Sequence, residues 1–265
     1  MSALSHELRL VAIAWQFLTR VPLPAAVVRR VGYRDAWLQA SARHFPLVGA
    51  MVGTGAAAVL LVASLVFPAA IAAGLCLAAT LLLTGGFHED GWADVCDGLG
   101  GSPDRERALQ IMKDSRIGAY GAIGLVLMLG LKWSALASMP AWVGAAALLL
   151  GHTASRAAAV GLIWRLRYAG DAEHAKAKPL AQHLSGGGWL VALAWAAAAG
   201  LASAFVLPLS ALALAVAAGG ATTGWCARWF NRRLGGYTGD CLGATQQLCE
   251  LTMYLGIVAG CQWTW

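Results

Sequence analysis

Charged residues are scarce in this chain of 265 residues, of which Asp, Glu, Lys and Arg together make up 12%. Hydrophobic residues make up 59%, and the mean hydropathy is +0.64. An average soluble domain carries about 25% charged residues, so this composition argues against an ordinary soluble protein. A lipid bilayer is the environment that the composition predicts.

Other features are missing as well. The six cysteines show no CxxC spacing, so they predict no zinc knuckle or dithiol motif, and we expect them to be small buried apolar side chains. The N-terminal region has no basic segment followed by an apolar run and a small-residue cleavage site. We therefore expect the first spanning helix to act as the insertion signal. No internal repeat or low-complexity linker divides the chain, which predicts a single integral-membrane domain, residues 1–265.

Seven apolar stretches have the length of about 20 residues that a membrane-spanning helix needs. Pro68, Pro140 and Pro208 break the sequence between neighbouring stretches, which predicts tight helical hairpins. Residues 5–24 have a shorter apolar core and predict an interfacial or re-entrant helix. The expected fold is therefore all-α and polytopic, with transmembrane helices over 47–67, 69–86, 117–137, 141–163, 188–206, 209–226 and 244–263.

The basic residues predict the orientation. Seventeen of the nineteen Lys and Arg lie in residues 1–46, 87–116, 164–187 and 227–243, which seven spans would place on one side of the membrane. The opposite turns and residues 261–265 carry none. By the positive-inside rule we expect the charged side to face the cytoplasm, in the inner membrane of a bacterium. Topology and the anionic leaflet account for the net charge of +6, so no nucleic-acid partner is predicted.

The acidic residues concentrate in one place: HEDGWADVCDG, residues 88–98, holds four of them. If this stretch is helical, Asp94 and Asp97 lie within about 40° of Asp90, so three carboxylates share one face. Like charges on one face repel, so a cation should hold them. Oxygen ligands suit Mg²⁺, or Mn²⁺, better than Zn²⁺. Glu89 points elsewhere and is interpreted as a bystander or a loop-facing auxiliary. A solvated acidic loop is the alternative for the whole stretch.

Glycines accompany this acidic face, and a second polar stretch follows later in the chain. Gly91 and Gly98 leave room for substrate phosphates to approach the helix. Residues 232–244 contain basic residues, several glycines and Asp240 on the predicted cytoplasmic side. Asp240 and Gln247 repeat the seven-residue spacing of the first stretch, and Glu250 lies deeper in the last span, where an acid is a functional candidate.

Several segments resemble one family, the cobalamin synthases. Residues 88–98 resemble its H-x-D-G-x-A-D-x-x-D-G signature, and RALQIMKDSRIGAYG, residues 107–121, resembles its next motif. FLTRVP at 17–22, FPLVG at 45–49 and GYTGDCLGA at 236–244 match further segments in the same order. Gln247 departs from the acid that many members have there, which puts its role as a metal ligand in doubt.

The resemblance implies an adenosylcobinamide-GDP ribazoletransferase of late vitamin B12 synthesis. Such an enzyme joins adenosylcobinamide-GDP to α-ribazole or its 5′-phosphate and releases GMP. Transfer of this kind depends mainly on positioning and on neutralising phosphate charge. The expected partners are these substrates and the lipid bilayer, together with a homo-oligomer or other enzymes of B12 assembly.

The motif matches also imply roles for individual residues. Asp90, Asp94 and Asp97 are expected to bind Mg²⁺ and take part in catalysis, with Asp240 as a further ligand. His88 or one of these carboxylates would accept the proton of the attacking hydroxyl, although a histidine beside a metal site also serves to orient ligands. The expected substrate contacts are Lys113, Asp114, Ser115, Arg116, Arg156, Thr238, Gly239 and Asp240.

Two cations lie inside predicted spans. Arg156 is about seven residues inside the fourth span, where an unpaired guanidinium costs a few kcal/mol, so we expect it to pair with an acid or a substrate phosphate. Lys132 is placed near the opposite interface, where its side chain would extend toward the headgroups.

Two other functions fit parts of the pattern. A CDP-alcohol phosphotransferase also places several Asp along a membrane helix, but its D-G-x-x-A-R opening differs from the spacing here, where Asp94 follows Ala93. A transporter would place polar groups near the middle of the bilayer on interrupted helices. The predicted polar stretches of this chain lie at one surface, which favours the enzyme.

Overall fold

A computed structural model describes residues 3–32, 34–170 and 184–261. These residues form a helical bundle whose only β feature is an isolated bridge between Tyr168 and Tyr237. The helices are α1 (Ala3–Leu18), α2 (Ala25–Val31), α3 (Asp35–Ser41), the short 3-10 helix η1 (Ala42–His44), α4 (Phe45–Ala63), α5 (Ala69–Thr84), α6 (Phe87–Gly101), α7 (Arg105–Lys113), α8 (Ala119–Ala137), α9 (Ala141–Arg165), α10 (Gly186–Ser203), α11 (Leu209–Leu234) and α12 (Gly239–Gly260). The expected all-α class is confirmed.

The spanning helices are fewer than expected by length and composition. Five helical stretches among the described residues are long and apolar enough to cross a membrane: Asp35–Ala63, Ala119–Ala137, Ala141–Arg165, Gly186–Ser203 and Leu209–Leu234. The bent pair Ala69–Thr84 and Phe87–Gly101 raises the number to six. The last predicted span forms α12, but it is not among these stretches because Gln246, Gln247 and Glu250 lower its hydropathy. A polytopic membrane protein is confirmed, with five to six such spans instead of seven.

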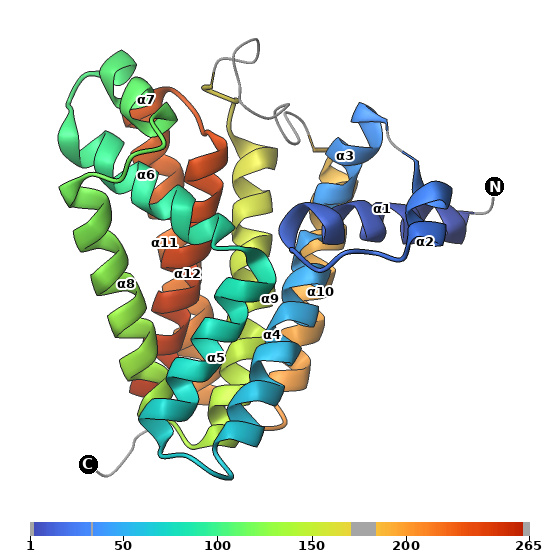
Figure 1. Ribbon diagram of the computed structural model, residues 1–265, viewed down its shortest axis with the longest axis vertical. Helices are drawn as coiled ribbons and strands as arrows, with labels where there is room; N and C mark the ends of the chain where they lie inside the picture. The colour runs from blue at the N-terminus through green and yellow to red at the C-terminus, as the bar shows by residue number, and fades with distance from the viewer. Residues whose placement is uncertain (1–2, 33, 171–183, 262–265) are drawn as a thin grey trace.

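The proline hairpins form as predicted. Pro68, Pro140 and Pro208 are the N-cap residues of α5, α9 and α11, where a missing backbone N–H leaves no helical bond unmade. The three hairpin turns lie at the end of the bundle opposite α7 (Figure 1). At the α7 end lie the α6–α7 and α11–α12 connections, so the two polar stretches share one end of the molecule.

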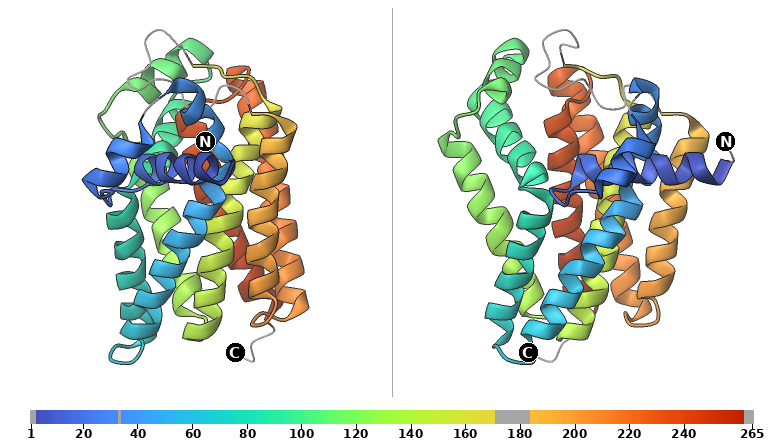
Figure 2. Two further views of the ribbon diagram at one scale, coloured as in Figure 1. Left: turned by 90° about the vertical axis from the view of Figure 1, so that its right-hand side faces the viewer. Right: turned by 45° about the vertical axis from the view of Figure 1, so that its right-hand side comes forward.

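The N-terminal helix α1 does not run along the bundle. It lies across the long helices instead of alongside them, as both views of Figure 2 show. The helix α1 carries charged residues and lies beside α3, which fits a helix at the membrane surface.

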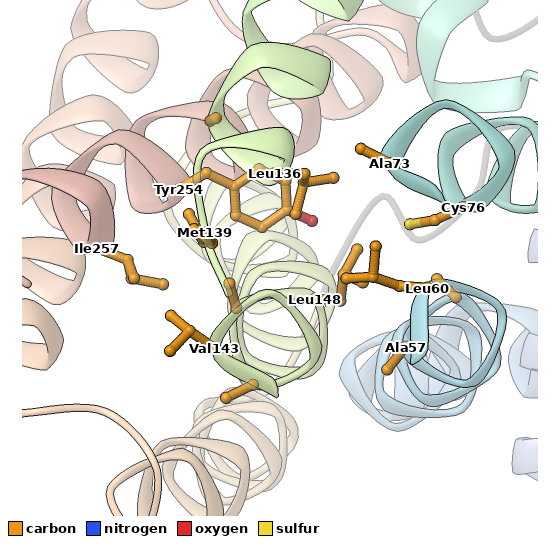
Figure 3. Close-up of a cluster of buried hydrophobic side chains, with 14 of the residues drawn as sticks. Ala57, Leu60, Ala73, Cys76, Leu136, Met139, Val143, Leu148, Tyr254 and Ile257 are labelled. Atoms are coloured by element: carbon orange, nitrogen blue, oxygen red, sulfur yellow. The ribbon is translucent and has the colours of Figure 1, made fainter. Parts of the chain in front are cut away.

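Small and branched side chains fill the bundle away from the polar end. Figure 3 shows this cluster, in which Leu60 of α4, Leu148 of α9 and Tyr254 of α12 converge. Cys76 of α5 is fully buried among them. All six cysteines are free, and four of them, Cys76, Cys226, Cys241 and Cys249, are buried as expected, whereas Cys96 and Cys261 are partly exposed.

Candidate active site

Two consecutive glycines create the acidic corner of the molecule. Gly85 ends α5 and Gly86 begins α6, and both have a left-handed backbone, with φ of 69° and 68°. Residues with a Cβ rarely adopt this conformation. The axes of α5 and α6 therefore meet at 91°, and α6 turns away to pack against α12, α8 and α7. The bend places the first turn of α6, with its acids, at an inside corner.

A cavity of about 420 Å³ occupies this corner. Glu89, Asp90 and Asp94 line it from α6, and Arg20 lines it from the α1–α2 connection. The other lining residues are Gly85, Gly86, Phe87, Ala93, Ser115, Ile117 and Leu125. Of the expected site residues, Asp90, Asp94 and Ser115 thus meet in one cavity, which can receive a polar, anionic group through Arg20 and a metal through the acids.

Glu89, interpreted as a bystander or a loop-facing auxiliary, lies closer to the other acids than its helical spacing indicated. Its side chain lines the cavity beside Asp90 and Asp94. Its Oε1 accepts a hydrogen bond from Nε2 of Gln247 at 2.9 Å, whereas its Oε2 is buried and has no partner among the described residues. Helical spacing alone missed Glu89 because the cavity wraps around the start of α6 and does not lie along one stripe.

Asp97 has a different position from the one expected. Its side chain is buried, and the residue is not among those lining the cavity. The backbone N–H groups of Gly118 and Gly121 donate to its two carboxylate oxygens at 2.7 and 2.8 Å. Since the first N–H groups of a helix lack intrahelical partners, Asp97 stabilises the start of α8. Its part in a metal site stays a prediction.

The second polar stretch reaches α6 through backbone contact. A Cβ on Gly91 would lie 3.0 Å from the Cα and the carbonyl oxygen of Asp240, and one on Gly243 would lie 3.0 Å from the carbonyl oxygen of His88. We expected Gly91 to admit substrate phosphates, but the structure uses it to let α12 approach α6. Gly98 likewise meets Ala108 and Met112 of α7. The close approach brings Asp240, a predicted ligand, to the acidic helix.

The remaining predicted residues of this stretch sit where α12 begins. Thr238 is its N-cap, and its Oγ1 accepts from the backbone N–H of Cys241 at 3.3 Å. Gly239 is the first residue of α12. Neither of them lines the cavity, so their substrate contacts stay predictions.

The cation in the cavity is Arg20, which was not among the expected contacts. The expected Lys113 ends α7 and is exposed. Arg116 is paired with Asp114 at 2.6 Å outside the cavity lining, and this carboxylate raises the pKa of the guanidinium. Arg20 could have been suspected from the FLTRVP match, in which it is the one charged residue.

Arg156 is buried, but no ion pair joins it to an acid within the described part of the chain. Its Nη1 donates to the carbonyl oxygen of His152 at 2.9 Å and lies 3.2 Å from Nδ1 of the same residue, and its Nε has no partner. The expected pairing with an acid is therefore not formed, and contact with a phosphate stays a prediction.

His88 is also buried and is not a lining residue of the cavity. Its ring packs edge-on against Phe87, with centroids 5.5 Å apart. Its role as a base or an orienting residue stays a prediction.

Lys132 does not extend toward the headgroups, as we expected, but is 2% exposed inside the bundle. Its Nζ pairs with Oε1 of Glu250 at 2.9 Å and donates to Oε1 of Gln247 at 2.7 Å. The helical spacing of residues within α8 could not reveal Gln247 and Glu250, which lie more than a hundred residues later in the chain. We call Lys132, His152, Gln246, Gln247, Glu250 and Tyr254 the buried network; hydrogen bonds or ion pairs connect each of them to Glu250 directly or through a neighbour.

The donor set of the cavity fits a hard divalent cation. Glu89, Asp90 and Asp94 offer only oxygen atoms, which Mg²⁺ and Mn²⁺ prefer. Within residues 3–32, 34–170 and 184–261, no three His, Cys, Asp or Glu side chains are close enough to hold an ion by themselves. Mg²⁺ commonly binds through one or two carboxylates plus substrate phosphates, so the carboxylates here fit an ion that arrives with its substrate.

A bundle of long apolar helices that also holds a carboxylate-lined cavity defines a polytopic membrane protein with a polar site. The family model described as cobalamin-5-phosphate synthase matches residues 10–258. The chain belongs to this family.

Curated relatives match over nearly their whole length. A relative from Leptothrix cholodnii is 59% identical over 265 residues, covering 98% of both chains. One from a Polaromonas species is 46% identical, covering 97% of this chain and 99% of its own. One from Ralstonia nicotianae is 43% identical, covering 100% and 99%. Each is named adenosylcobinamide-GDP ribazoletransferase. No solved structure matches the chain.

Proposed function

We propose that this chain is an adenosylcobinamide-GDP ribazoletransferase, which joins adenosylcobinamide-GDP to α-ribazole or its 5′-phosphate. The family match over residues 10–258 carries the proposal, and the shared name of its relatives specifies the activity. The product is adenosylcobalamin or its 5′-phosphate. A phospholipid-forming phosphotransferase and a transporter are not favoured, because the match covers nearly the whole chain.

The reaction replaces the pyrophosphate bond to GMP with a phosphodiester bond to the ribose of α-ribazole. A ribose hydroxyl of α-ribazole attacks the phosphorus attached to the cobinamide arm and forms a new P–O bond. The bridging P–O bond of the pyrophosphate breaks, and GMP leaves with the bridging oxygen. The hydroxyl proton passes to a base near the cavity, for which His88 and the cavity carboxylates are the candidates.

Asp90 and Asp94 are the residues that would hold Mg²⁺, together with oxygens of the pyrophosphate. Asp240 comes close to the same helix through Gly91, which supports it as a further ligand. When bound, Mg²⁺ would neutralise phosphate charge in the transition state. Asp97 would have to release the N–H groups of α8 to join this set.

Arg20 and Ser115 complete the cavity on its other walls. A guanidinium forms two parallel hydrogen bonds to a phosphate, which positions it as well as attracting it. The Ser115 hydroxyl can donate to a phosphate oxygen. These two groups orient the pyrophosphate toward the carboxylates on α6.

The α6–α7 and α11–α12 connections lie together at one end of the bundle (Figure 1), and the acids of the cavity belong to α6, the helix that leads into the first of these connections. These connections belong to the segments that carry most of the Lys and Arg. The positive-inside rule supports a cytoplasmic site in a bacterial inner membrane, where soluble nucleotide substrates are available.

The test is a reconstituted reaction. Purified protein in detergent micelles is incubated with adenosylcobinamide-GDP, α-ribazole and Mg²⁺, and GMP and the corrinoid product are quantified by chromatography. We expect both in equal amounts, no GMP without Mg²⁺, and no turnover of CDP-diacylglycerol with an alcohol. Absence of the corrinoid product from folded protein would refute the proposed activity.

A further inference from the structure

A chain of hydrogen bonds connects the buried network to the cavity. Nζ of Lys132 donates to Oε1 of Gln247 at 2.7 Å, and Nε2 of Gln247 donates to Oε1 of Glu89 at 2.9 Å. Lys132 comes from α8, Gln247 from α12 and Glu89 from α6. Three helices therefore meet in one line of polar contacts that ends at the cavity wall.

The direction of this chain is determined by chemistry. An ammonium group only donates hydrogen bonds, so the atom of Gln247 that faces Lys132 must be its carbonyl oxygen. The amide nitrogen of Gln247 then points to Glu89 and to Oε1 of Gln246, 2.8 Å away. An amide N–H calls for an acceptor, which a carboxylate supplies. Lys132 thereby sets the orientation of Gln247, and Gln247 sets the position of Glu89.

The chain is anchored where it cannot easily rearrange. Lys132, Gln247 and Glu250 are each 2% exposed. The carboxylate of Glu250 accepts from Nζ of Lys132 at 2.9 Å and from the hydroxyl of Tyr254 at 3.1 Å. A buried ion pair that is also hydrogen-bonded holds its members in one geometry.

Glu89 is left with one oxygen to offer. Its Oε1 is used by Gln247, and its Oε2 is buried without a partner among the described residues. A buried carboxylate oxygen without a hydrogen bond is unfavourable, so a small rotation that brings it to a cation or donor in the cavity would stabilise it. Glu89 lies beside Asp90 at the same cavity, where the proposed Mg²⁺–pyrophosphate complex would bind.

We propose that Lys132 and Gln247 are positioning residues of the active site, which hold the Glu89 carboxylate toward the bound metal–pyrophosphate complex. The inference rests on the proposed function for the identity of that complex. This role would explain why Lys132 is buried and why Gln247, an amide, stands where an acid was expected. Loss of such outer partners commonly lowers metal affinity or activity by about 10- to 100-fold.

The test separates this role from a merely structural one by measuring metal binding without turnover. Mn²⁺ is titrated by electron paramagnetic resonance into full-length protein with adenosylcobinamide-GDP present and α-ribazole absent. Gln247→Met is compared with Tyr254→Phe. Tyr254 is also buried and its hydroxyl donates to Glu250 in the same network, but no hydrogen bond joins it to Gln247 or Glu89 within the described residues. We expect Gln247→Met to weaken Mn²⁺ binding roughly 10-fold, and Tyr254→Phe to leave it within about 2-fold of wild type.

A double-mutant comparison sharpens the result. In a Glu89→Ala background, Gln247→Met should weaken Mn²⁺ binding no further, because its effect passes through Glu89. The shorter amide Gln247→Asn, which cannot reach both partners, gives the same comparison if the methionine variant does not fold. Equal losses for Tyr254→Phe and Gln247→Met, or an undiminished effect without Glu89, would overturn the inference.

The two proposals fail in different ways. Wild-type protein that binds Mn²⁺ but releases no GMP when α-ribazole is added contradicts the proposed function and leaves the positioning chain standing. Wild-type protein that turns over, with Gln247→Met binding Mn²⁺ and reacting normally, contradicts the positioning chain alone.

Discussion

The cavity and the buried network both contain several charged side chains within the helical bundle, but these charges are balanced differently. In the buried network, Glu250 is matched by Lys132 at 2.9 Å and by His152 at 3.3 Å. The cavity is lined by three carboxylates, with Arg20 as the one lining cation. The charges of the buried network are thus paired within the network, whereas the cavity lining carries more negative than positive charge and favours a cation brought by the ligand. Substitutions that leave a charge of the buried network unpaired should therefore lower the free energy of unfolding, and substitutions of the cavity acids should lower the reaction rate.

The largest effect is expected from breaking the buried pair. Lys132→Met leaves Glu250 charged and buried without its main partner, which should lower the free energy of unfolding by about 3–5 kcal/mol. Denaturant unfolding in detergent micelles measures it. The double variant Lys132→Met with Glu250→Gln removes both charges and should recover most of the loss. A double variant as unstable as the sum of the single changes would contradict a self-compensated network.

The cavity acids should show the opposite behaviour. Asp90→Asn and Asp94→Asn each remove charge that faces the ligand, so the rate of GMP release should fall by about 10²- to 10³-fold. Thermal unfolding of Asp90→Asn should stay at or above the wild-type temperature, because one repulsive charge has been removed. If either variant unfolds earlier than wild type while retaining its rate, that acid belongs with the structural charges.

Arg20 tests the phosphate side of the cavity. Arg20→Gln should raise KM for adenosylcobinamide-GDP by about 10- to 100-fold, since charge-assisted hydrogen bonds contribute about 1.5–3 kcal/mol. Steady-state kinetics with varied adenosylcobinamide-GDP measure the change. Arg116→Gln is the matched control, because Arg116 is paired with Asp114 and is not a lining residue. Equal effects of the two changes would show that Arg20 acts only through overall charge.

Asp97 combines features of both regions. It belongs to the same acidic segment as the cavity acids, but its carboxylate is buried and hydrogen-bonded to the protein. Asp97→Asn exchanges an acceptor for an amide group next to two backbone N–H groups, which should lower stability by about 1–2 kcal/mol. Hydrogen exchange at the start of α8 should rise, and Mn²⁺ binding should change less than in Asp90→Asn. A loss of Mn²⁺ binding equal to that of Asp90→Asn would return Asp97 to the metal site.

Local patterns in the sequence predicted most of the fold. Apolar length located the helices of the bundle, and three prolines marked three hairpins, because both signals act within a few residues. The composition of α12 shows the limit of such rules. Gln246, Gln247 and Glu250 make it less apolar than the spans, although it packs against α6, α9 and α11.

The candidate site was predictable only in part, because residues far apart in the sequence determine which acids line the cavity. Asp90 and Asp94 were found from helical spacing, and Ser115 from a motif match. Glu89 and Asp97 exchanged their expected positions, since one faces Gln247 and the other faces Gly118. No spacing within residues 88–98 could reveal these partners, which lie about 160 and 20 residues further along the chain.

The contact between Gly91 and α12 also has a consequence for how the protein is made. A ribosome completes α6 long before it reaches Gly243, so the first turns of α6 lack their α12 neighbour during most of synthesis. Until α12 arrives, Asp240 and Gln247 cannot take their places beside the acids of α6. Assembly of the reactive corner is therefore tied to the final stage of translation, which keeps an incomplete chain from holding a finished site in the membrane.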